Sequence, residues 1–302
     1  MIRLPEPYAG RLQHKASLAR YTAARLGGPA DLLYVAKEST DELATVVMSA
    51  WEQEVPVRVL GGGANVLISD KGVRGLVVVN DVSEVTFGEW HDGRNVSATG
   101  GMGLTVLARK CQSRGLAGLE WAASVPGTIG GAVVNNAGAH GSDIRANLRE
   151  AVILEAGHGI HIMPLEELTY GYRSSALKAR VDRRFLVLLA QFALPQDDPA
   201  AIMDRIEHNV AYRKQTQPPG ASLGSIFKNP AGNHAGRLIE EAGLKGYSIG
   251  GAQVSPIHAN FFINTGEATA TDYYALIRYV QEKVRKQSHI ELEMEVEVVG
   301  EW

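Results

Sequence analysis

The sequence has very little cysteine and no long apolar run, and each shortage excludes a class of protein. Its single cysteine, Cys111, rules out an internal disulfide and is typical of a reducing compartment. No window has the length and apolar content of a membrane span. The first ten residues, MIRLPEPYAG, contain two prolines and lack the apolar core of a signal peptide. We therefore expect a cytoplasmic protein with no membrane partner.

Charge and metal-binding motifs are also scarce. The formal net charge is only −3, which gives no reason to expect a nucleic-acid partner. The nine histidines are scattered, and neither an H-E-x-x-H motif nor a cysteine–histidine cluster is present, so we expect no metal site. Ser225 in LGSIF lacks the strand–turn–helix setting that the nucleophile elbow of a hydrolase needs. With 302 residues and 45% hydrophobic content, the chain can form a substantial core divided between two or three domains.

What the sequence does contain is a glycine-rich stretch at residues 122–141, AASVPGTIGGAVVNNAGAHG. It has five glycines and no acidic residue, lysine or arginine. Glycine permits positive φ and lets backbone N–H groups approach a ligand closely. The apolar residues Val125, Ile129, Val133 and Val134 indicate a loop folded into the body of the protein. The stretch is either a tight buried turn or a cradle for a large, flat, phosphate-bearing cofactor, and we favour the cradle.

The N-terminal part of the chain predicts a strand–helix–strand unit. Residues 32–36 and 55–60 are the strands, and 39–51 is the helix, because Ser39 and Glu42 have capping-box spacing before an apolar face. The second strand runs into GGGANVLI at 61–68. This is not the G-x-G-x-x-G pattern of a Rossmann fold, since residues 66–70 resemble a strand more than a helical turn. We predict a phosphate-binding nest of backbone N–H groups instead.

The rest of the chain predicts a mixture of strands and helices. We expect strands at 75–80, 96–98, 151–155, 161–162, 185–194 and 258–264, and helices at 103–115, 236–242 and 271–286. The segment PQDDP at 195–199 is the best internal boundary, and Pro199 suits a helix start. Residues 213–224 predict a polar, turn-rich segment. Strict alternation of apolar and acidic residues at 290–298 predicts one half-buried strand with four glutamates on its polar face.

Two polar residues in unusual local settings are candidates for chemistry. Arg173, in a predicted turn, could hold an anion bidentately or form an ordinary surface ion pair. Ser225, with Lys228 three residues on, could release a proton if buried near cations, or could be an ordinary turn serine. The motifs NNAG at 135–138 and Y-x-x-x-K at 279–283 also occur in short-chain dehydrogenases, but their order along this chain argues against that class.

Taken in order, the motifs resemble the UDP-N-acetylenolpyruvoylglucosamine reductase family, flavoenzymes of peptidoglycan precursor synthesis. The resemblance covers residues 18–300. Its motifs are RLGGPA at 25–30, LGGGANVL at 60–67, VPGTIGGA at 125–132, NAG at 136–138, YRSS at 172–175, GSIFKNP at 224–230, HANF at 258–261 and EV at 295–296. Their joint order makes the match specific, although no single motif does.

The resemblance implies an α+β chain with a vanillyl-alcohol-oxidase/PCMH-type FAD-binding fold. On that pattern, residues 1–80 and 81–197 are two FAD-binding subdomains, and 198–302 is a substrate-binding domain whose last strand returns to the active site. The length indicates the family's second type, without an extra tyrosine loop. The implied contacts to non-covalent FAD are Gly61, Gly62, Gly63, Ala64, Asn65, Val66, Leu67, Ser124, Val125, Pro126, Gly127, Thr128, Gly130, Gly131, Asn135, Ala137 and Gly138.

The resemblance also implies the chemistry. NADPH reduces the flavin, and the flavin N5 passes the hydride to C3 of the enolpyruvyl ether of UDP-N-acetylglucosamine. Arg173 and Glu295 stabilise the charge that develops, and Ser225 protonates C2 to give UDP-N-acetylmuramate. Lys228 is the candidate cation that assists Ser225. From periodicity alone, Glu295 is one of four equivalent glutamates, and the family's Glu-Val pair is what selects it.

Further residues are expected to contact the substrate: Tyr172, Arg213, Lys214, Gln217, Lys228, Asn229, His258 and Asn260. Two positions depart from the family pattern, with Ala64 where serine is frequent and Met294 where proline is frequent. We expect a monomer that binds only small molecules. The alternatives are another FAD-dependent oxidoreductase of the same fold, or a nucleotide-sugar binding protein without turnover.

Overall fold

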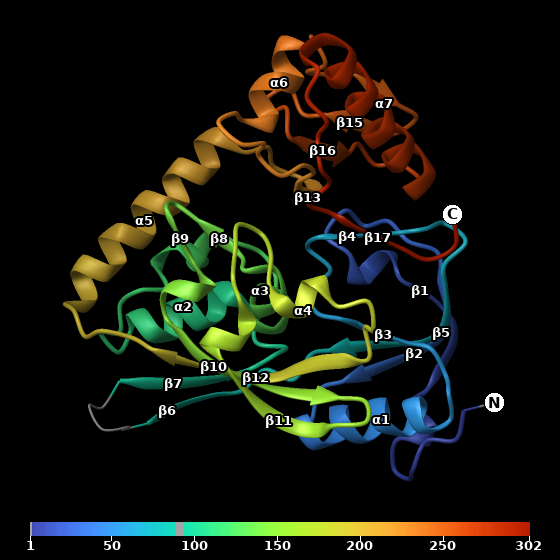
Figure 1. Ribbon diagram of the computed structural model, residues 1–302, viewed down its shortest axis with the longest axis vertical. Coiled ribbons are helices and arrows are strands. Elements are labelled where there is room, and N and C mark those ends of the chain that lie inside the picture. The colour runs from blue at the N-terminus through green and yellow to red at the C-terminus, as the bar shows by residue number, and fades with distance from the viewer. Residues whose placement is uncertain (1, 89–93) are drawn as a thin grey trace. The chain divides into compact units, whose positions relative to one another are not determined.

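The computed structural model describes residues 2–88 and 94–302, and its contacts separate the chain into two compact units. Unit 1 comprises Met1–Leu12, Leu33–Gly62 and Leu76–Tyr212, and unit 2 comprises Gln13–Leu32, Gly63–Gly75 and Arg213–Trp302. The elements are labelled in Figure 1. Among the residues described, every helix is too short or too polar to cross a lipid bilayer. Because each unit is assembled from separate parts of the chain, neither follows from the order of motifs alone.

The centre of unit 1 is an antiparallel sheet with strand order β11-β10-β12-β7-β6. Its strands are β6 (Val85–Gly88), β7 (Asn95–Thr99), β10 (Leu148–Glu155), β11 (Gly159–Pro164) and β12 (Phe185–Ala193). Strand β12 is buried along most of its length, as expected for a central strand with few polar residues. The sheet therefore forms a rigid platform for the segments that follow β7 and precede β10.

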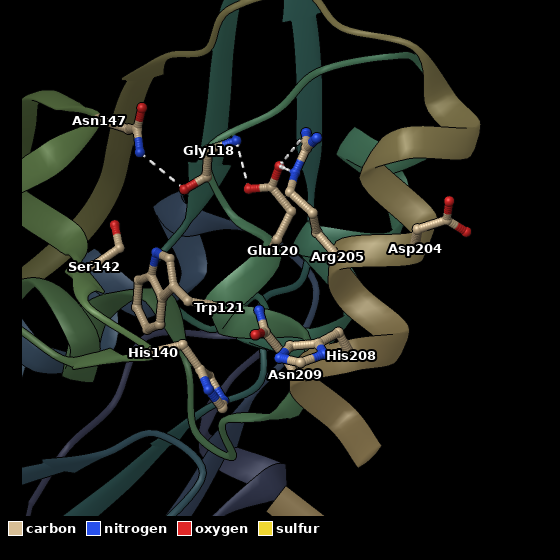
Figure 2. Close-up of a pocket in the computed structure, with 10 residues that line it drawn as sticks. All are labelled: Gly118, Glu120, Trp121, His140, Ser142, Asn147, Asp204, Arg205, His208 and Asn209. Atoms are coloured by element: carbon tan, nitrogen blue, oxygen red, sulfur yellow. Dashed lines mark hydrogen bonds and ion pairs between the residues drawn. The ribbon is translucent and has the colours of Figure 1, made fainter. Parts of the chain in front are cut away.

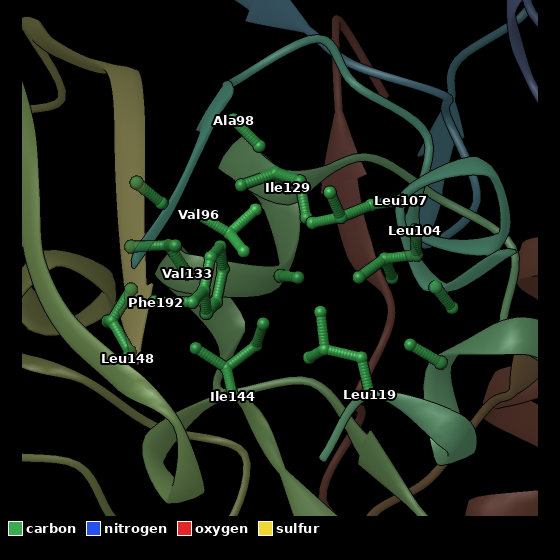
Figure 3. Packing of buried hydrophobic residues seen from close by; sticks show 14 of the residues in the cluster. Val96, Ala98, Leu104, Leu107, Leu119, Ile129, Val133, Ile144, Leu148 and Phe192 are labelled. Atoms are coloured by element: carbon green, nitrogen blue, oxygen red, sulfur yellow. The ribbon is translucent and has the colours of Figure 1, made fainter. Parts of the chain in front are cut away.

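One face of this sheet is covered by α2 (Leu104–Gln112) and α3 (Ile129–Asn135). Figure 3 shows the core beneath them, where Leu107, Ile129 and Val133 from the helices meet Phe192 from β12. All four side chains are fully buried. The predicted inward face of α2, including Cys111, lies in the same core. Burial at helical spacing thus fixes which side of each helix meets the sheet.

A parallel strand pair and a helix form the N-terminal part of unit 1. Strand β3 (Val57–Leu60) pairs in parallel with β5 (Val73–Asn80), and α1 (Thr40–Glu52) packs against β3. Ser39 caps α1 by accepting a hydrogen bond from the Glu42 N–H, as its spacing predicts. Strand β2 (Pro29–Ala36) and β5 each begin in the chain segments of unit 2 and end in those of unit 1.

The remaining elements of unit 1 are short, except for one long helix. They are η1 (Ala9–Arg11), η3 (Glu120–Ser124), β8 (Gly138–Ala139), β9 (Ser142–Asp143), η4 (Ile144–Ala146), η5 (Leu165–Leu168), α4 (Ala176–Ala179) and α5 (Pro199–Thr216). Helix α5 begins at Pro199, as predicted, and buries Ile202 and Ile206. Its last residues carry the chain from unit 1 into unit 2.

Unit 2 is built on an antiparallel sheet with strand order β13-β16-β15-β14. The strands are β13 (Ala221–Ser225), β14 (Ser248–Ile249), β15 (Ala252–Val254) and β16 (Phe261–Asn264). Helix α7 (Ala270–Ser288) packs on this sheet and on α6 (Ala235–Glu241). Strand β4 (Val66–Ile68) pairs in parallel with β17 (Glu297–Val299), and β1 (Gln13–Ser17) and η2 (Ala19–Tyr21) complete the unit.

Three predicted segments were wrong. Residues 122–141 are not one loop, because Ile129 and Val133 bury the face of a short helix, α3. Residues 213–224 are not a turn-rich segment, since they contain the end of α5 and most of β13. The alternating residues 290–298 do not form one strand, because regular pairing is confined to β17 and an isolated bridge at Met294. The division into three domains at residues 80 and 197 stays a prediction.

Candidate active site

Two glycine segments that lie far apart in the sequence meet inside unit 1. Gly61 and Gly62 follow β3 and lie against Gly127 and Thr128, which precede α3. A Cβ atom at Gly61 would stand 2.1 Å from Thr128 Oγ1, and one at Gly62 would stand 3.3 Å from Gly127 Cα. The approach is possible because the backbone carries no side chain there. Parts of both predicted cofactor segments are therefore brought together.

The first N–H groups of α3 do not point at open space. The Ile129 N–H donates to Met102 O at 2.9 Å, and the Gly130 N–H donates to Gly100 O at 2.8 Å. These donors are used within the protein, so a nest of free N–H groups is not the way this part of the stretch could hold a ligand. Sequence reasoning missed the supporting segment 100–102, and the Gly-Gly pair directly after β7 was the signal available.

Two other features of the stretch fit a bound polar, flat group. Ser124 Oγ is buried and has no hydrogen-bond partner among the described residues, an arrangement that costs free energy unless a ligand or water completes it. Gly131 is exposed, and a Cβ placed on it would meet only Thr128 Oγ1, at 3.8 Å. The chain itself therefore does not require glycine at that position. A buried hydroxyl available for a hydrogen bond and a bare backbone position in the same stretch are both features that a polar, flat ligand such as FAD could use.

Arg173 is held against the second half of the glycine-rich stretch. Its guanidinium donates to Gly138 O at 2.6 Å and to Asn136 O at 3.4 Å. The Tyr172 ring lies 5.4 Å from the guanidinium carbon. Arg173 has φ +52° in a turn closed by mutual backbone hydrogen bonds between Gly171 and Ser174. The predicted turn is confirmed, and the guanidinium is anchored next to predicted cofactor residues.

The residues on either side of Arg173 tie this turn to α3. Tyr170 Oη donates to Val133 O at 2.8 Å, and Ser175 Oγ donates to Val134 O at 2.6 Å. Burial raises the pKa of Tyr170, so its hydroxyl stays a neutral donor. The position of Arg173 is therefore coupled to the end of α3 by hydrogen bonds on both sides of the turn.

In unit 2, the backbone places Ser225 beside the segment that carries Glu295. Ser225 ends β13, and the next residue, Ile226, accepts a hydrogen bond from the Glu295 N–H at 2.8 Å. Phe227 and Met294 form the adjacent bridge. Two residues predicted to act together, seventy positions apart, are thus brought next to each other. Glu295 is also half-buried, whereas Glu293 is exposed, so the glutamates of this segment are not equivalent.

The end of the glycine-triplet loop joins the same place in unit 2. Asn65 Nδ2 donates to Glu295 O at 3.0 Å, and Asn65 O accepts from the Glu297 N–H at 3.0 Å. Gly63 has φ +57°, and a Cβ there would lie 2.0 Å from Tyr21 O. Leu67, predicted as a cofactor contact, has its side chain in the unit 2 core. The predicted cofactor residues 61–67 are therefore divided between the two units, with 61–62 in unit 1.

Lys228, the predicted assistant of Ser225, is already paired. Its ammonium lies 2.5 Å from Glu293 Oε1, and its backbone N–H donates to Glu293 O at 2.9 Å. The Lys228 side chain is 18% exposed, against 71% for Glu293. Part of the positive charge expected to favour loss of the Ser225 proton is thus offset by a carboxylate that sequence reasoning did not weigh.

The predicted substrate residues have varied surroundings. Burial lowers the pKa of the Arg213 guanidinium, and Gln217 Oε1 is buried without a partner among the described residues. Lys214 is exposed at the end of α5. Asn229 Oδ1 accepts from the first N–H of α6, at Ala235. Buried unpaired polar atoms such as Gln217 Oε1 are the ones most able to gain from a ligand.

His258 and Asn260 are mostly enclosed by protein. Burial lowers the pKa of His258, and its ring lies edge-on to Phe261 at 4.9 Å between centroids. His258 Nδ1 accepts from the Asn260 N–H at 3.2 Å, which requires the proton to be on Nε2 when the ring is neutral. Asn260 is 3% exposed. Their predicted contact with substrate stays a prediction.

A pocket of about 510 Å³ lies between α5 and the loop around His140 in unit 1 (Figure 2). Its lining residues are Gly118, Glu120, Trp121, His140, Ser142, Asn147, Asp204, Arg205, His208 and Asn209. Arg205 pairs with Glu120 at 2.8 Å, and the Gly118 N–H donates to the same carboxylate at 2.7 Å. The buried Trp121 indole N–H has no partner among the described residues. The residues that line this pocket include no predicted catalytic residue.

The predicted catalytic residues belong to different units. Arg173 and most of the glycine-rich cradle are in unit 1, while Ser225 and Glu295 are in unit 2. Each unit assembles its own share of the residues through the backbone contacts given above. The joint convergence of all three side chains stays a prediction.

Two family models match the chain. Residues 214–299 match the family model described as UDP-N-acetylenolpyruvoylglucosamine reductase, C-terminal domain, and residues 32–157 match the FAD binding domain. The chain is 40% identical over 309 residues to the UDP-N-acetylenolpyruvoylglucosamine reductase of Bacillus pumilus, covering 99% of this chain and 97% of that protein. It is 45% identical over 284 residues to the protein of that name from Rubrobacter xylanophilus, covering 94% of each.

A solved structure is similar over nearly the whole chain. The crystal structure of UDP-N-acetylenolpyruvylglucosamine reductase from Thermus caldophilus matches with a TM-score of 0.79 and 34% sequence identity, covering 96% of this chain and 99% of that one. The match confirms the FAD-binding α+β fold expected from the motifs. Since identity of 40% extends over almost the full length of the relatives, the chain belongs to the UDP-N-acetylenolpyruvoylglucosamine reductase family.

Proposed function

We propose that this protein reduces the enolpyruvyl ether of UDP-N-acetylglucosamine to UDP-N-acetylmuramate, with FAD as its cofactor and NADPH as the reductant. The observation that carries the proposal is a backbone contact in unit 2, where the Glu295 N–H donates to the oxygen of Ile226, the residue after Ser225. The full-length relatives and the FAD binding domain support the same reaction. When bound, FAD supplies the hydride that it has taken from NADPH.

The chain's own residues must handle charge and a proton. As hydride reaches C3 of the enol ether, negative charge develops at C2 and on the neighbouring carboxylate. Fixed donors and cations stabilise such charge best when they need no reorganisation. Arg173 meets that requirement because two carbonyl oxygens and a turn hold its guanidinium. We assign Arg173 to the developing enolate. Glu295 is assigned to the same site by the family resemblance, and it can support the enolate only as a hydrogen-bond donor, in its protonated form.

Ser225 is assigned to donate its hydroxyl proton to C2. A serine is a weak acid, so it can act only where nearby charge stabilises the alkoxide that remains. Lys228 is three residues away, and its ion pair with Glu293 places both a cation and an anion in that segment. The assignment of the glycine-rich stretch to FAD is supported by exposed Gly131 and by the buried Ser124 Oγ, which has no hydrogen-bond partner within residues 2–88 and 94–302.

The remaining assignments follow from the reaction. Arg213 is proposed to bind the diphosphate or the carboxylate of the substrate, since it is a desolvated cation. Gln217 can donate to the same anions through its amide nitrogen, while its buried Oε1, which has no partner among the described residues, is free to accept from a hydroxyl or N–H group of the substrate. We keep a monomer and a cytoplasmic location as part of the proposal. The single buried cysteine is consistent with a reducing compartment.

The experiment separates the two half-reactions by stopped-flow absorbance. The purified protein is expected to be yellow, to release its flavin on denaturation, and to bleach faster with NADPH than with NADH. Ser225→Ala should leave bleaching by NADPH unchanged and slow reoxidation by the enolpyruvyl substrate by about a hundredfold or more, the usual contribution of a general acid. Ser222→Ala, on the same strand, is the control. Equal loss of both half-reactions in Ser225→Ala contradicts its assignment, and covalently retained flavin favours another oxidoreductase of this fold.

A further inference from the structure

Ser225 lies where its strand is irregular. Strand β13 pairs with β16 at Ser222–Ile263 and at Ser225–Phe261, with a shift of register between the two pairs. Gly224 lies inside this bulge with φ +73°. A bulge bends the strand and releases the residue after it from the regular alternation of side chains. The direction of the Ser225 side chain therefore depends on what holds the residues that follow.

A buried asparagine holds those residues from one side. Asn260, which is 3% exposed, accepts a hydrogen bond from the Phe227 N–H at its Oδ1 (3.0 Å) and donates from Nδ2 to Phe227 O (2.8 Å). Its backbone oxygen accepts from the Ile226 N–H at 2.9 Å. The side-chain amide thus makes, for Phe227, the two backbone hydrogen bonds that a neighbouring strand would otherwise supply. Only a side chain with both a donor and an acceptor at this spacing can pair with the N–H and the C=O of one residue.

Further hydrogen bonds fix Asn260 and also hold the segment after Ser225 from its other side. Its N–H donates to His258 Nδ1, and the backbone N–H groups of Ile257 and His258 donate to Ser255 Oγ. Ser255 is fully buried. From the other side of the Ser225 segment, the Glu295 N–H donates to Ile226 O. The peptide between Ile226 and Phe227, directly after Ser225, is therefore held by Asn260 on one side and by the Glu295 segment on the other.

We propose that Asn260 is a positioning residue for Ser225, in place of the substrate contact expected from the sequence. Its Oδ1 and one Nδ2 hydrogen are committed to Phe227, and its burial leaves little of it to face a substrate. The proposal rests on the proposed function, because it gives Ser225 the role of acid. Proton delivery to C2 requires the Ser225 hydroxyl to be held in one position. The hydrogen bonds from Asn260 to Phe227 supply that restraint.

The test uses Asn260→Asp, which keeps the shape but sets an oxygen against Phe227 O. Asn264→Asp is the matched control, since Asn264 also holds backbone groups, donating to Ala24 O at 2.9 Å, but not those after Ser225. Asn260→Asp should slow reoxidation by the enolpyruvyl substrate by about tenfold to a hundredfold, the range expected for a reacting group displaced by about 1 Å, with reduction by NADPH unchanged. The control should leave the ratio of the two half-reactions unchanged. Asn260→Ser, whose shorter side chain removes at least one of the two hydrogen bonds to Phe227 without adding a charge, should also slow reoxidation and serves if the Asp variant does not fold.

Two readouts distinguish positioning from other roles. Deuterium exchange at the Phe227 amide should accelerate in Asn260→Asp relative to the control, and the double variant with Ser225→Ala should reoxidise no more slowly than Ser225→Ala alone. The proposal is overturned if the double variant reoxidises more slowly by the product of the two single fold-losses. A raised KM for substrate with an unchanged rate of reoxidation overturns it as well. Normal reoxidation in Ser225→Ala instead overturns the acid assignment and this inference with it. Slow Ser225→Ala with normal Asn260→Asp overturns the inference alone.

Discussion

Gly131 gives the sharpest test of the cofactor site, because no contact in the described part of the chain requires a glycine there. It is the third residue of α3 and is exposed, and a Cβ would meet only Thr128 Oγ1, at 3.8 Å. Glycine within a helix is less stable than alanine by about 0.5–1 kcal/mol. We therefore expect Gly131→Ala to raise the free energy of unfolding of the flavin-free protein by that amount.

The same methyl group should weaken cofactor binding. If the bare backbone at Gly131 contacts FAD, an added Cβ forces the ligand or α3 to shift, and overpacking of this kind costs about 1–3 kcal/mol. A loss of about 1.4 kcal/mol corresponds to a tenfold increase in Kd. Since bound ligand stabilises the folded state in proportion to its affinity, the variant should be more stable than wild type without FAD and gain less when FAD is added.

The assay is thermal unfolding of flavin-stripped protein with and without FAD, combined with a fluorescence titration for Kd. A gain of up to 1 kcal/mol corresponds to roughly 1–2 °C in a chain of 302 residues. Gly10→Ala is the control, because a Cβ there has nothing within 4 Å and the residue is in a different segment. Unchanged FAD affinity in Gly131→Ala, or lower stability without FAD, would refute the reasoning that the glycine is kept for the cofactor.

Three further predictions concern stability and reactivity. Glu42 is buried, and although burial opposes its ionisation, hydrogen bonds from Tyr34 Oη and from backbone N–H groups keep its pKa lowered. That stabilisation is present above the unfolded pKa of the carboxyl and is lost as pH falls through the folded pKa. Glu42→Gln should therefore lower the free energy of unfolding by about 1.5–3 kcal/mol at pH 7. It should also make the free energy of unfolding depend less on pH on the acid side. Asp70 accepts from the N–H groups of Ala270 and Thr271 at the start of α7, so Asp70→Ala should cost about 1 kcal/mol, measured by denaturant unfolding. Burial raises the pKa of the Cys111 thiol to about 12, so a thiol reagent at pH 8 should modify Cys111 only at the rate of unfolding, and rapid labelling of the folded protein would contradict its burial.

Local patterns were sufficient for the elements in which one physical signal dominates. Helices α1, α2 and α7 have apolar residues at helical spacing over several turns, and the predicted faces are buried. The reading of residues 66–68 as a strand rather than a Rossmann helix is confirmed by β4. The family and its FAD-binding fold could also be predicted, because the joint order of several motifs is specific even though no single motif is.

Local patterns failed where a long-range contact decides the outcome. The sequence of α3 did not predict a helix, because two of its seven residues are glycine. The helix forms because Ile129 and Val133 are buried against the sheet. The alternation at 290–298 indicated one strand, but the segment pairs first with residues 226–228 and then with β4, so regular pairing cannot run through it. Tertiary packing overrides a local preference when the buried area and the backbone hydrogen bonds it satisfies are worth more than the preference.

The residue types of the site could be read from the sequence, because phosphate, hydride and proton chemistry each restrict which side chains can serve. How those residues are held could not. No spacing rule shows that Asn260 clamps the peptide after Ser225, that Glu293 pairs with Lys228, or that the Arg173 guanidinium is anchored on Gly138 O. Hydrogen bonds between residues tens of positions apart depend on where the folded backbone places each donor and acceptor, so only the tertiary structure decides them.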